Sequence, residues 1–149
     1  MRLISILFMA VLVFAGELKI SSQKFFYDSK KLVSVFEGDV NAKKDKDTII
    51  ADVLKVYFNK QRKPLKIEAI GNVKFTIAMD KNSTYKGRCQ HLFYNIKTGD
   101  VLLIGNAFIK KIETNESISG EKIKINRLTK DVEVIGNSKK PVNIIIKVD

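Results

Sequence analysis

The sequence has one cysteine, Cys89, one histidine, His91, and no tryptophan. A lone cysteine cannot close a disulfide within the chain, so the fold must be stabilised by core burial and strand pairing. Cys89 is either a buried small apolar side chain or a stray thiol, and we favour the first. Cys89 and His91 supply only two potential ligands, which are too few for a zinc site. We expect both residues on one face of a strand, where they do not have the geometry of a catalytic nucleophile with its general base.

The motifs of the common enzyme classes are missing as well. Glycine-rich phosphate loops, nucleophile elbows and zinc-protease signatures do not occur, and the carboxylates are scattered among lysines instead of being paired. We therefore expect no catalytic residue, no cofactor and no metal ion, which excludes most enzyme functions.

Charged residues are absent from the run 3–15, which follows Arg2 and ends in small residues. This pattern predicts a signal peptide over residues 1–15, cleaved before Gly16, and one domain over residues 16–149. A membrane-spanning helix requires about 20 apolar residues, so an uncleaved anchor is the weaker interpretation. No cysteine follows the run, which excludes a lipid-modified N-terminus.

Basic residues dominate the chain, whose net charge is +11. Removal of residues 1–15 takes away one arginine and no acid, which leaves +10. Export disfavours nucleic acid as the partner, so anionic lipid, phosphorylated glycolipid or an acidic protein surface remains. A lysine-rich face that only contacts solvent explains the charge equally well.

Alternation of apolar and polar residues predicts strands along most of the chain. In residues 67–77 the odd positions are apolar or glycine and the even positions are mostly polar, a period of two that is typical of a half-buried strand. Beyond the signal segment no helical stripe exceeds two turns. We therefore expect an all-β domain.

A Gly-Asp or Gly-Asn pair recurs along the chain, beginning at Gly38, Gly71, Gly105 and Gly136, at spacings of 33, 34 and 31 residues. An Asp or Asn that closes a strand precedes each pair. The glycines share the apolar face, where a glycine marks a bulge, a bend or a close approach. Four units of three short strands predict about a dozen strands, which must stack, fold over or close.

Five segments carry a family resemblance: FEGDVNAK, IIADVLKVYFN, KIEAIGNVKF, GDVLLIGNAFIK and ISGEKIKIN. Together, from about Leu18 to Gly136, they resemble the LptA family, also called OstA-like, of periplasmic lipopolysaccharide-transport proteins. The resemblance implies an incomplete, open antiparallel β-jelly roll built from about four repeats of roughly 33 residues. It also implies an apolar interior that holds the acyl chains of lipid A.

The resemblance further implies that the protein bridges the inner and outer membranes in lipopolysaccharide assembly. Its partners would be lipopolysaccharide, the inner-membrane transport complex and the outer-membrane translocon, with head-to-tail self-association through strand addition at the open sheet ends. Three alternatives remain open at this point: a membrane-anchored sister component of the same pathway, LptC-like, a polymerising β-solenoid scaffold that binds no lipid, and an exported enzyme. The enzyme is the least favoured of the three, because the sequence offers no catalytic constellation.

Strand parity selects the apolar residues expected to line the lipid-binding interior, since a shift of one residue would exchange the two faces. The candidates are Phe36, Val40, Val56, Phe58, Ile67, Val73, Phe75, Leu103, Ile109, Ile123 and Ile125.

Overall fold

The computed structural model describes residues 18–148, and the expected signal peptide lies outside these residues. All of the regular elements within this range are β-strands. They are β1 (Leu18–Ser21), β2 (Lys24–Asp28), β3 (Val33–Lys44), β4 (Asp47–Phe58), β5 (Pro64–Asp80), β6 (Ser83–Asn95), β7 (Asp100–Lys111), β8 (Ser117–Asn126), β9 (Val132–Ile135) and β10 (Asn143–Ile145). The described part of the chain contains no helix long and apolar enough to span a bilayer.

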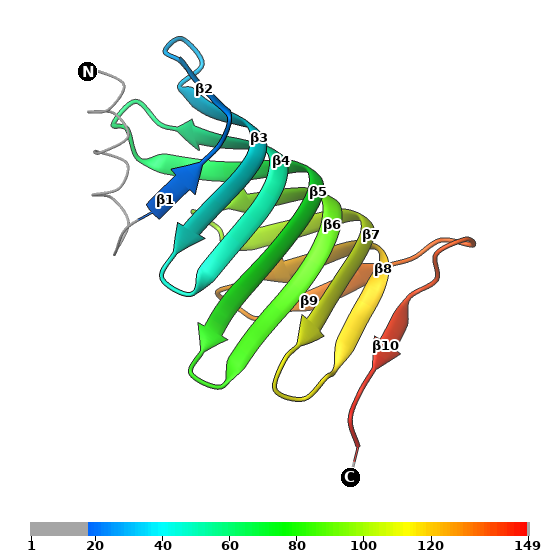
Figure 1. Cartoon of the computed structure of the whole chain (residues 1–149). Coiled ribbons are helices and arrows are strands. Elements are labelled where there is room, and N and C mark those ends of the chain that lie inside the picture. Colours follow the sequence, from blue (N-terminus) through cyan, green and yellow to red (C-terminus); the bar gives the residue numbers. More distant parts are fainter. Residues whose placement is uncertain (1–17, 149) are drawn as a thin grey trace.

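The strands form a single antiparallel sheet that follows the order of the chain (Figure 1). From β3 to β8 each strand pairs with the next. At one margin both β1 and β2 pair with β3, and at the other both β9 and β10 pair with β8. The two margins do not pair with each other, so the sheet is open, as expected.

Side-chain oxygens of Asp or Asn organise the turns at one end of the strands. Asn95 accepts hydrogen bonds from the backbone N–H groups of Lys97 and Thr98, and Asp28, Asn59 and Asn126 make equivalent bonds in their own turns. Such Asx turns offer the backbone a local alternative to continued strand pairing. The recurring Asp or Asn of the repeat therefore ends the strand that precedes it.

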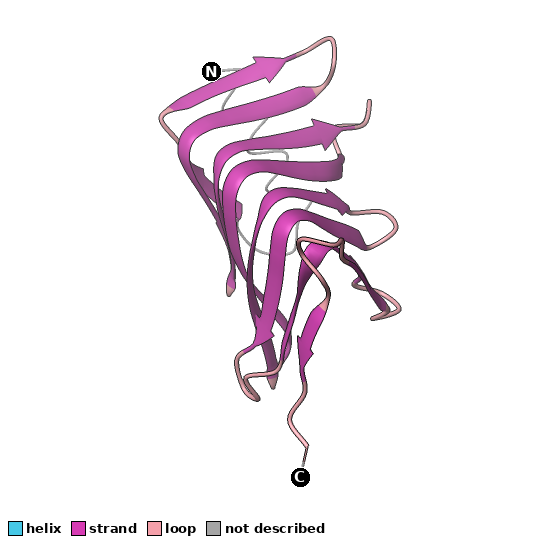
Figure 2. Cartoon of the chain, turned by 90° about the vertical axis from the view of Figure 1, so that its right-hand side faces the viewer, coloured by secondary structure: helices cyan, strands magenta, loops and turns pink. Residues whose placement is uncertain are grey.

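Three of the four Gly-Asx pairs lie in the middle of strands, where each forms a bulge. Gly71 has φ of +84° and Asn72 has φ of +48°, and the register of β5 against β6 shifts between Ile70 and Val73. The pairs in β3 and β7 have the same left-handed geometry and the same register shift. Two residues on each bulged strand therefore oppose one on its neighbour, and every long strand bends at this line (Figure 2).

The bend divides the sheet into two facing layers, here named arm 1 and arm 2. Arm 1 contains the strand halves next to the Asx turns, together with β2 and β9; arm 2 contains the other halves, together with β1 and β10. Each margin therefore consists of two short strands that are separated at the bend. Residues 22–23 separate β1 from β2, and residues 136–142 separate β9 from β10.

Two expectations on the repeat need correction. Residues 18–148 form ten strands where about a dozen were expected, because the long strands continue through the bulge instead of ending there. The fourth pair also differs from the others: Gly136 and Asn137 follow β9 in a turn, where Asn137 accepts hydrogen bonds from the backbone N–H groups of Lys139 and Lys140. The fourth repeat is therefore partial.

Candidate functional site

Apolar side chains from every long strand lie between the two arms and form one continuous cluster. All of the sequence-predicted interior residues belong to it or pack against it. Nine are buried: Phe36, Val40, Val56, Phe58, Val73, Phe75, Leu103, Ile109 and Ile123. Ile67 and Ile125 are half-buried and pack against the buried set. All eleven side chains therefore lie in the interior cluster or against it.

Gly87 gives the inner face of arm 2 its shape. It pairs with Phe75 on β5 and Ile109 on β7, and a Cβ atom at this position would lie 2.3 Å from the Phe75 ring and 2.6 Å from the Phe108 carbonyl oxygen. Only a residue without a side chain lets the Phe75 ring approach the backbone of β6 this closely.

An apolar cavity of about 270 Å³ opens between the arms at the β5 to β8 end of the sheet. Its wall combines predicted residues with apolar residues that the sequence reasoning missed. The predicted ones are Phe75, Leu103, Ile109, Ile123 and Ile125, and the missed ones are Ile77, Met79, Tyr85, Val101, Ile118 and Val132. Ile77, Met79 and Val101 alternate with predicted residues along β5 and β7, so parity was the signal that could have found these three.

The remaining predicted residues do not line this cavity. Phe36, Val40, Val56 and Phe58 lie in the packed part of the cluster formed by β3 and β4, and Ile67 and Val73 lie on β5 outside the cavity wall. The interior is thus filled at one end and hollow at the other.

Charged side chains surround the mouth of the cavity. Arg127, on arm 1, lies 3.9 Å from the Asp47 carboxylate on arm 2 and 5.6 Å from the centre of the Tyr94 ring. Lys130 and Asp80 also reach the cavity. The backbone N–H of Asn82 lowers the pKa of Asp80 by donating to its carboxylate, and the charge of Lys130 adds to this effect. Basic groups therefore lie beside an apolar opening, where they can attract an anion.

Cys89 and His91 lie on opposite faces of β6, which corrects the expectation that they share one. Cys89 is buried in the interior, and this burial raises the pKa of its thiol to about 11. His91 is on the outer face of arm 1, where its Nε2 lies 2.6 Å from the Glu68 carboxylate and its ring stacks on Phe93. The bend between them uses one residue of β6, Gln90, which reverses the parity.

Metal-binding geometry is absent from residues 18–148, where no three His, Cys, Asp or Glu side chains come together.

Glu68, His91 and Tyr57 form a hydrogen-bonded group on the outer face, with Tyr57 donating to Glu68 at 2.9 Å. Burial is the largest single influence on Glu68 and opposes its ionisation, but the hydrogen bonds from His91 and Tyr57 and the nearby charge of Lys55 together outweigh it and keep the pKa of the carboxyl below its ordinary value.

Comparison with known proteins identifies relatives of this open, two-armed sheet. The family model described as "LptA/(LptD N-terminal domain) LPS transport protein" matches residues 19–131. Among solved structures, the chain is similar to LptH of Pseudomonas aeruginosa, described as the LptA homologous periplasmic component of the lipopolysaccharide transport device. The TM-score is 0.77 at 15% identity, over 89% of this chain and 96% of that one. No curated protein sequence matches the chain.

Proposed function

The chain belongs to the LptA/LptD N-terminal domain family of lipopolysaccharide transport proteins, and from this premise we propose that it shelters the acyl chains of lipid A between its two arms. The family and the fold support a periplasmic role in lipopolysaccharide transport. We propose that the protein does this by binding alone and without catalysis.

The apolar cavity with a basic mouth is the observation that carries the proposal. Its wall offers isoleucine, leucine and aromatic side chains to hydrocarbon, while Arg127 and Lys130 lie where head-group phosphates would emerge. Burial of one methylene group stabilises a complex by about 0.8 kcal/mol, so partial sheltering of several acyl chains is enough to keep the lipid out of water.

The eleven residues predicted from parity are proposed as the lipid-facing surface, in two groups. The five that line the cavity would contact lipid directly. The other six lie in the packed part of the interior and would contact acyl chains only after the two arms separate there. This division makes Phe75 the better reporter of lipid and Phe36 the poorer one.

The bridge between membranes is also part of the proposal, as is removal of residues 1–15 during export. The two margins of the open sheet leave backbone groups available for strand addition. Ile145 and Ile146 at the β10 margin are 64% and 63% exposed, which is unusual for isoleucine unless a partner covers it. Another copy of this chain, or a related sheet in an inner- or outer-membrane complex, would fit these margins.

A photo-crosslinking experiment tests lipid binding. A benzophenone amino acid replaces Phe75, whose ring faces the cavity, or Phe93, whose ring lies on the outer face of arm 1. Because both sites hold a phenylalanine in the native chain, the pair is matched in size and chemistry. We expect irradiation of growing cells to attach lipopolysaccharide at position 75 and not at position 93. Equal capture at both positions, or capture at neither by an exported and folded protein, would disprove the proposal.

A further inference from the structure

The outer face of arm 2 carries a broad basic surface. Two rows of paired residues cross it from β3 to β10, and their side chains point away from the interior because they alternate with buried residues. One row is Lys43, Thr48, Thr76, Lys86, Lys110, Ser117 and Ile145, and the other is Asn41, Ile50, Lys74, Arg88, Phe108, Ser119 and Asn143.

Positive charge on this face is not balanced by acids. The two rows contain five lysine or arginine residues and, among these described positions, no carboxylate. Lys139 and Lys140 extend the positive charge at the β10 side. The outer face of arm 1 is different, because Glu68 and Glu133 there alternate with Lys55 and Lys124 along one row. The two rows on arm 2 therefore carry a net positive charge, whereas this row on arm 1 is balanced.

Apolar side chains are interspersed among these cations. Ile50 is 46% exposed and Ile112, just beyond β7, is 40% exposed. The guanidinium of Arg88 lies 4.6 Å from the centre of the Phe108 ring, so the charge is held beside an aromatic surface. A mixture of lysine, arginine, isoleucine and phenylalanine on one face is typical of segments that bind at a membrane interface.

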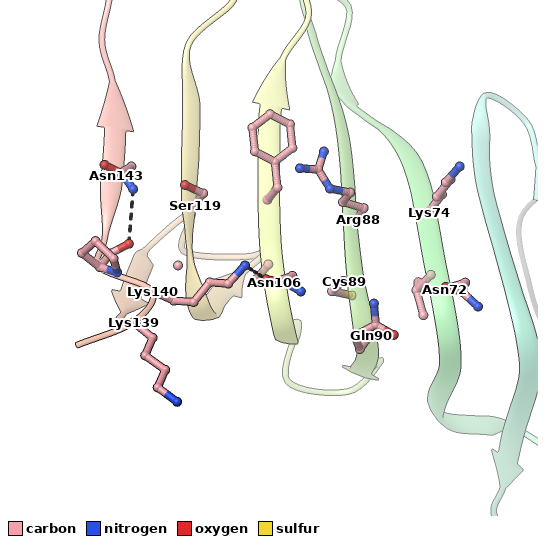
Figure 3. Close-up of a pocket in the computed structure, with 15 residues that line it drawn as sticks. Asn72, Lys74, Arg88, Cys89, Gln90, Asn106, Ser119, Lys139, Lys140 and Asn143 are labelled. Atoms are coloured by element: carbon pink, nitrogen blue, oxygen red, sulfur yellow. Dashed lines mark hydrogen bonds between the residues drawn. The ribbon is translucent and has the colours of Figure 1, made fainter. Parts of the chain in front are cut away.

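Two adjoining shallow clefts of about 710 and 510 Å³ cover much of this face and share Lys74, Arg88 and Phe108. The larger cleft lies beneath the segment 137–143, where Lys140 donates a hydrogen bond to Asn106 (Figure 3). Asn72, Ser119 and Asn143 add uncharged polar groups to its lining. Cations together with amide and hydroxyl groups match the phosphate and hydroxyl groups of a phospholipid head group.

We propose that the outer face of arm 2 is a docking surface for an anionic phospholipid bilayer. The clefts would take individual phosphate-bearing head groups, the surrounding lysines would neutralise their neighbours, and Ile50, Phe108 and Ile112 would reach the level of the upper acyl carbons. Protein interfaces are depleted in lysine, whereas four of the five cations in the two rows are lysines, and this favours a bilayer over an acidic protein.

This site is separate from the proposed lipid cavity. The cavity opens between the arms, whereas the basic rows lie on the opposite side of the arm 2 sheet. Docking on a bilayer therefore does not depend on acyl-chain binding. An experiment can disprove one of the two proposals without affecting the other.

A vesicle experiment with two quadruple variants tests the docking surface. One variant carries Lys74→Gln, Lys86→Gln, Arg88→Gln and Lys110→Gln on arm 2; the control carries Lys55→Gln, Lys66→Gln, Lys122→Gln and Lys124→Gln on the outer face of arm 1. Both lose the same net charge. Sedimentation with mixed phosphatidylglycerol and phosphatidylcholine vesicles should show binding at least about tenfold weaker for the arm 2 variant and little change for the control. Equal losses would mean undirected attraction by net charge and would overturn the proposal.

Tryptophan fluorescence gives a second readout, because the native chain has no tryptophan. A single Phe108→Trp substitution on arm 2, or Phe93→Trp on arm 1, places one reporter on each outer face. Anionic vesicles should shift the emission of the tryptophan at position 108 to shorter wavelength and leave that at position 93 unchanged, whereas vesicles of phosphatidylcholine alone should shift neither. Absence of a shift at position 108, or a shift only when the vesicles contain lipopolysaccharide, would exclude an anionic phospholipid bilayer as the ligand.

Discussion

The ionisation of Glu68 is linked to the folded state by its hydrogen bonds. It accepts hydrogen bonds from Tyr57 at 2.9 Å and lies 2.6 Å from His91 on the next strand, so one carboxylate ties together β4, β5 and β6. A hydrogen bond to a charged group contributes about 1.5–3 kcal/mol to stability, which is more than a neutral hydrogen bond contributes. The charge on Glu68 therefore contributes directly to the stability of the outer face of arm 1.

We expect Glu68→Gln to lower the free energy of unfolding by about 1–2 kcal/mol at neutral pH, because the amide keeps some of the hydrogen bonds but not the charge. The folded-state pKa of Glu68 is depressed, so its contribution is fully present above the ordinary glutamate pKa and is lost as pH falls through the lower folded value. The difference between wild type and variant should accordingly shrink in acid, and urea unfolding across a pH series measures it.

Glu133→Gln is the control for this prediction, since Glu133 is exposed on the same face in the short strand β9. Its stability should stay within about 0.5 kcal/mol of wild type at every pH. A pH-independent effect of Glu68→Gln would show that packing and not charge is responsible.

At the scale of the element, the Gly-Asx bulge decides the shape of every long strand. Gly71 is left-handed, and a Cβ atom there would lie 2.5 Å from a carboxylate oxygen of Asp52 on β4. Asn72 then donates a hydrogen bond to the same carboxylate. Backbone geometry and the facing side chain thus both select glycine followed by a short polar residue.

Gly71→Ala should therefore destabilise the fold by about 1–3 kcal/mol, measured by thermal or urea unfolding. The same substitution in an Asp52→Ala background separates the two causes, because the close contact is removed while the left-handed conformation remains. We expect a residual loss of about 1 kcal/mol in that background. A fully neutral Gly71→Ala substitution would mean that the bulge can move along β5 and does not fix the bend.

The bulge also explains how much of the interior could be predicted from the sequence. On β5 the bend takes up two residues, so Ala69 and Val73 keep the same parity and the alternation visible in the sequence remains valid. On β6 it takes up only Gln90, so the parity reverses and His91 faces away from Cys89. Sequence periodicity records alternation within a strand, but the number of residues used at a bend depends on the neighbouring strand.

The strand count failed for a related reason. A glycine inside a strand indicates either an end or a bulge, and the difference lies in hydrogen bonds to other strands. The interruption of both margins, between β1 and β2 and between β9 and β10, likewise arises from pairing with a single long neighbour. The family resemblance predicted the open roll correctly. The cavity at the β5 to β8 end could not be predicted, because it depends on packing between side chains of different strands, which local sequence does not encode.

At the scale of the whole molecule, the open margins decide whether the protein can form a chain of subunits. Each margin differs from the other in sequence and shape, so contact between unlike margins propagates instead of closing. The isoleucines beyond β8 are exposed in the single chain, which is costly for a protein that does not associate.

We expect wild-type protein to show a rise in mass with concentration by size-exclusion chromatography with light scattering. A double variant with Ile145→Lys and Ile146→Lys should remain a monomer, because charges on an edge strand oppose strand addition. Leu128→Lys is the control: Leu128 is 72% exposed but lies in the turn between β8 and β9 and not on a margin strand, so this variant should associate like wild type. If the double variant associates normally, the β10 margin is not the contact; if wild type is monomeric at all concentrations, the open sheet does not self-associate, and a bridge would have to form with other proteins at its two ends.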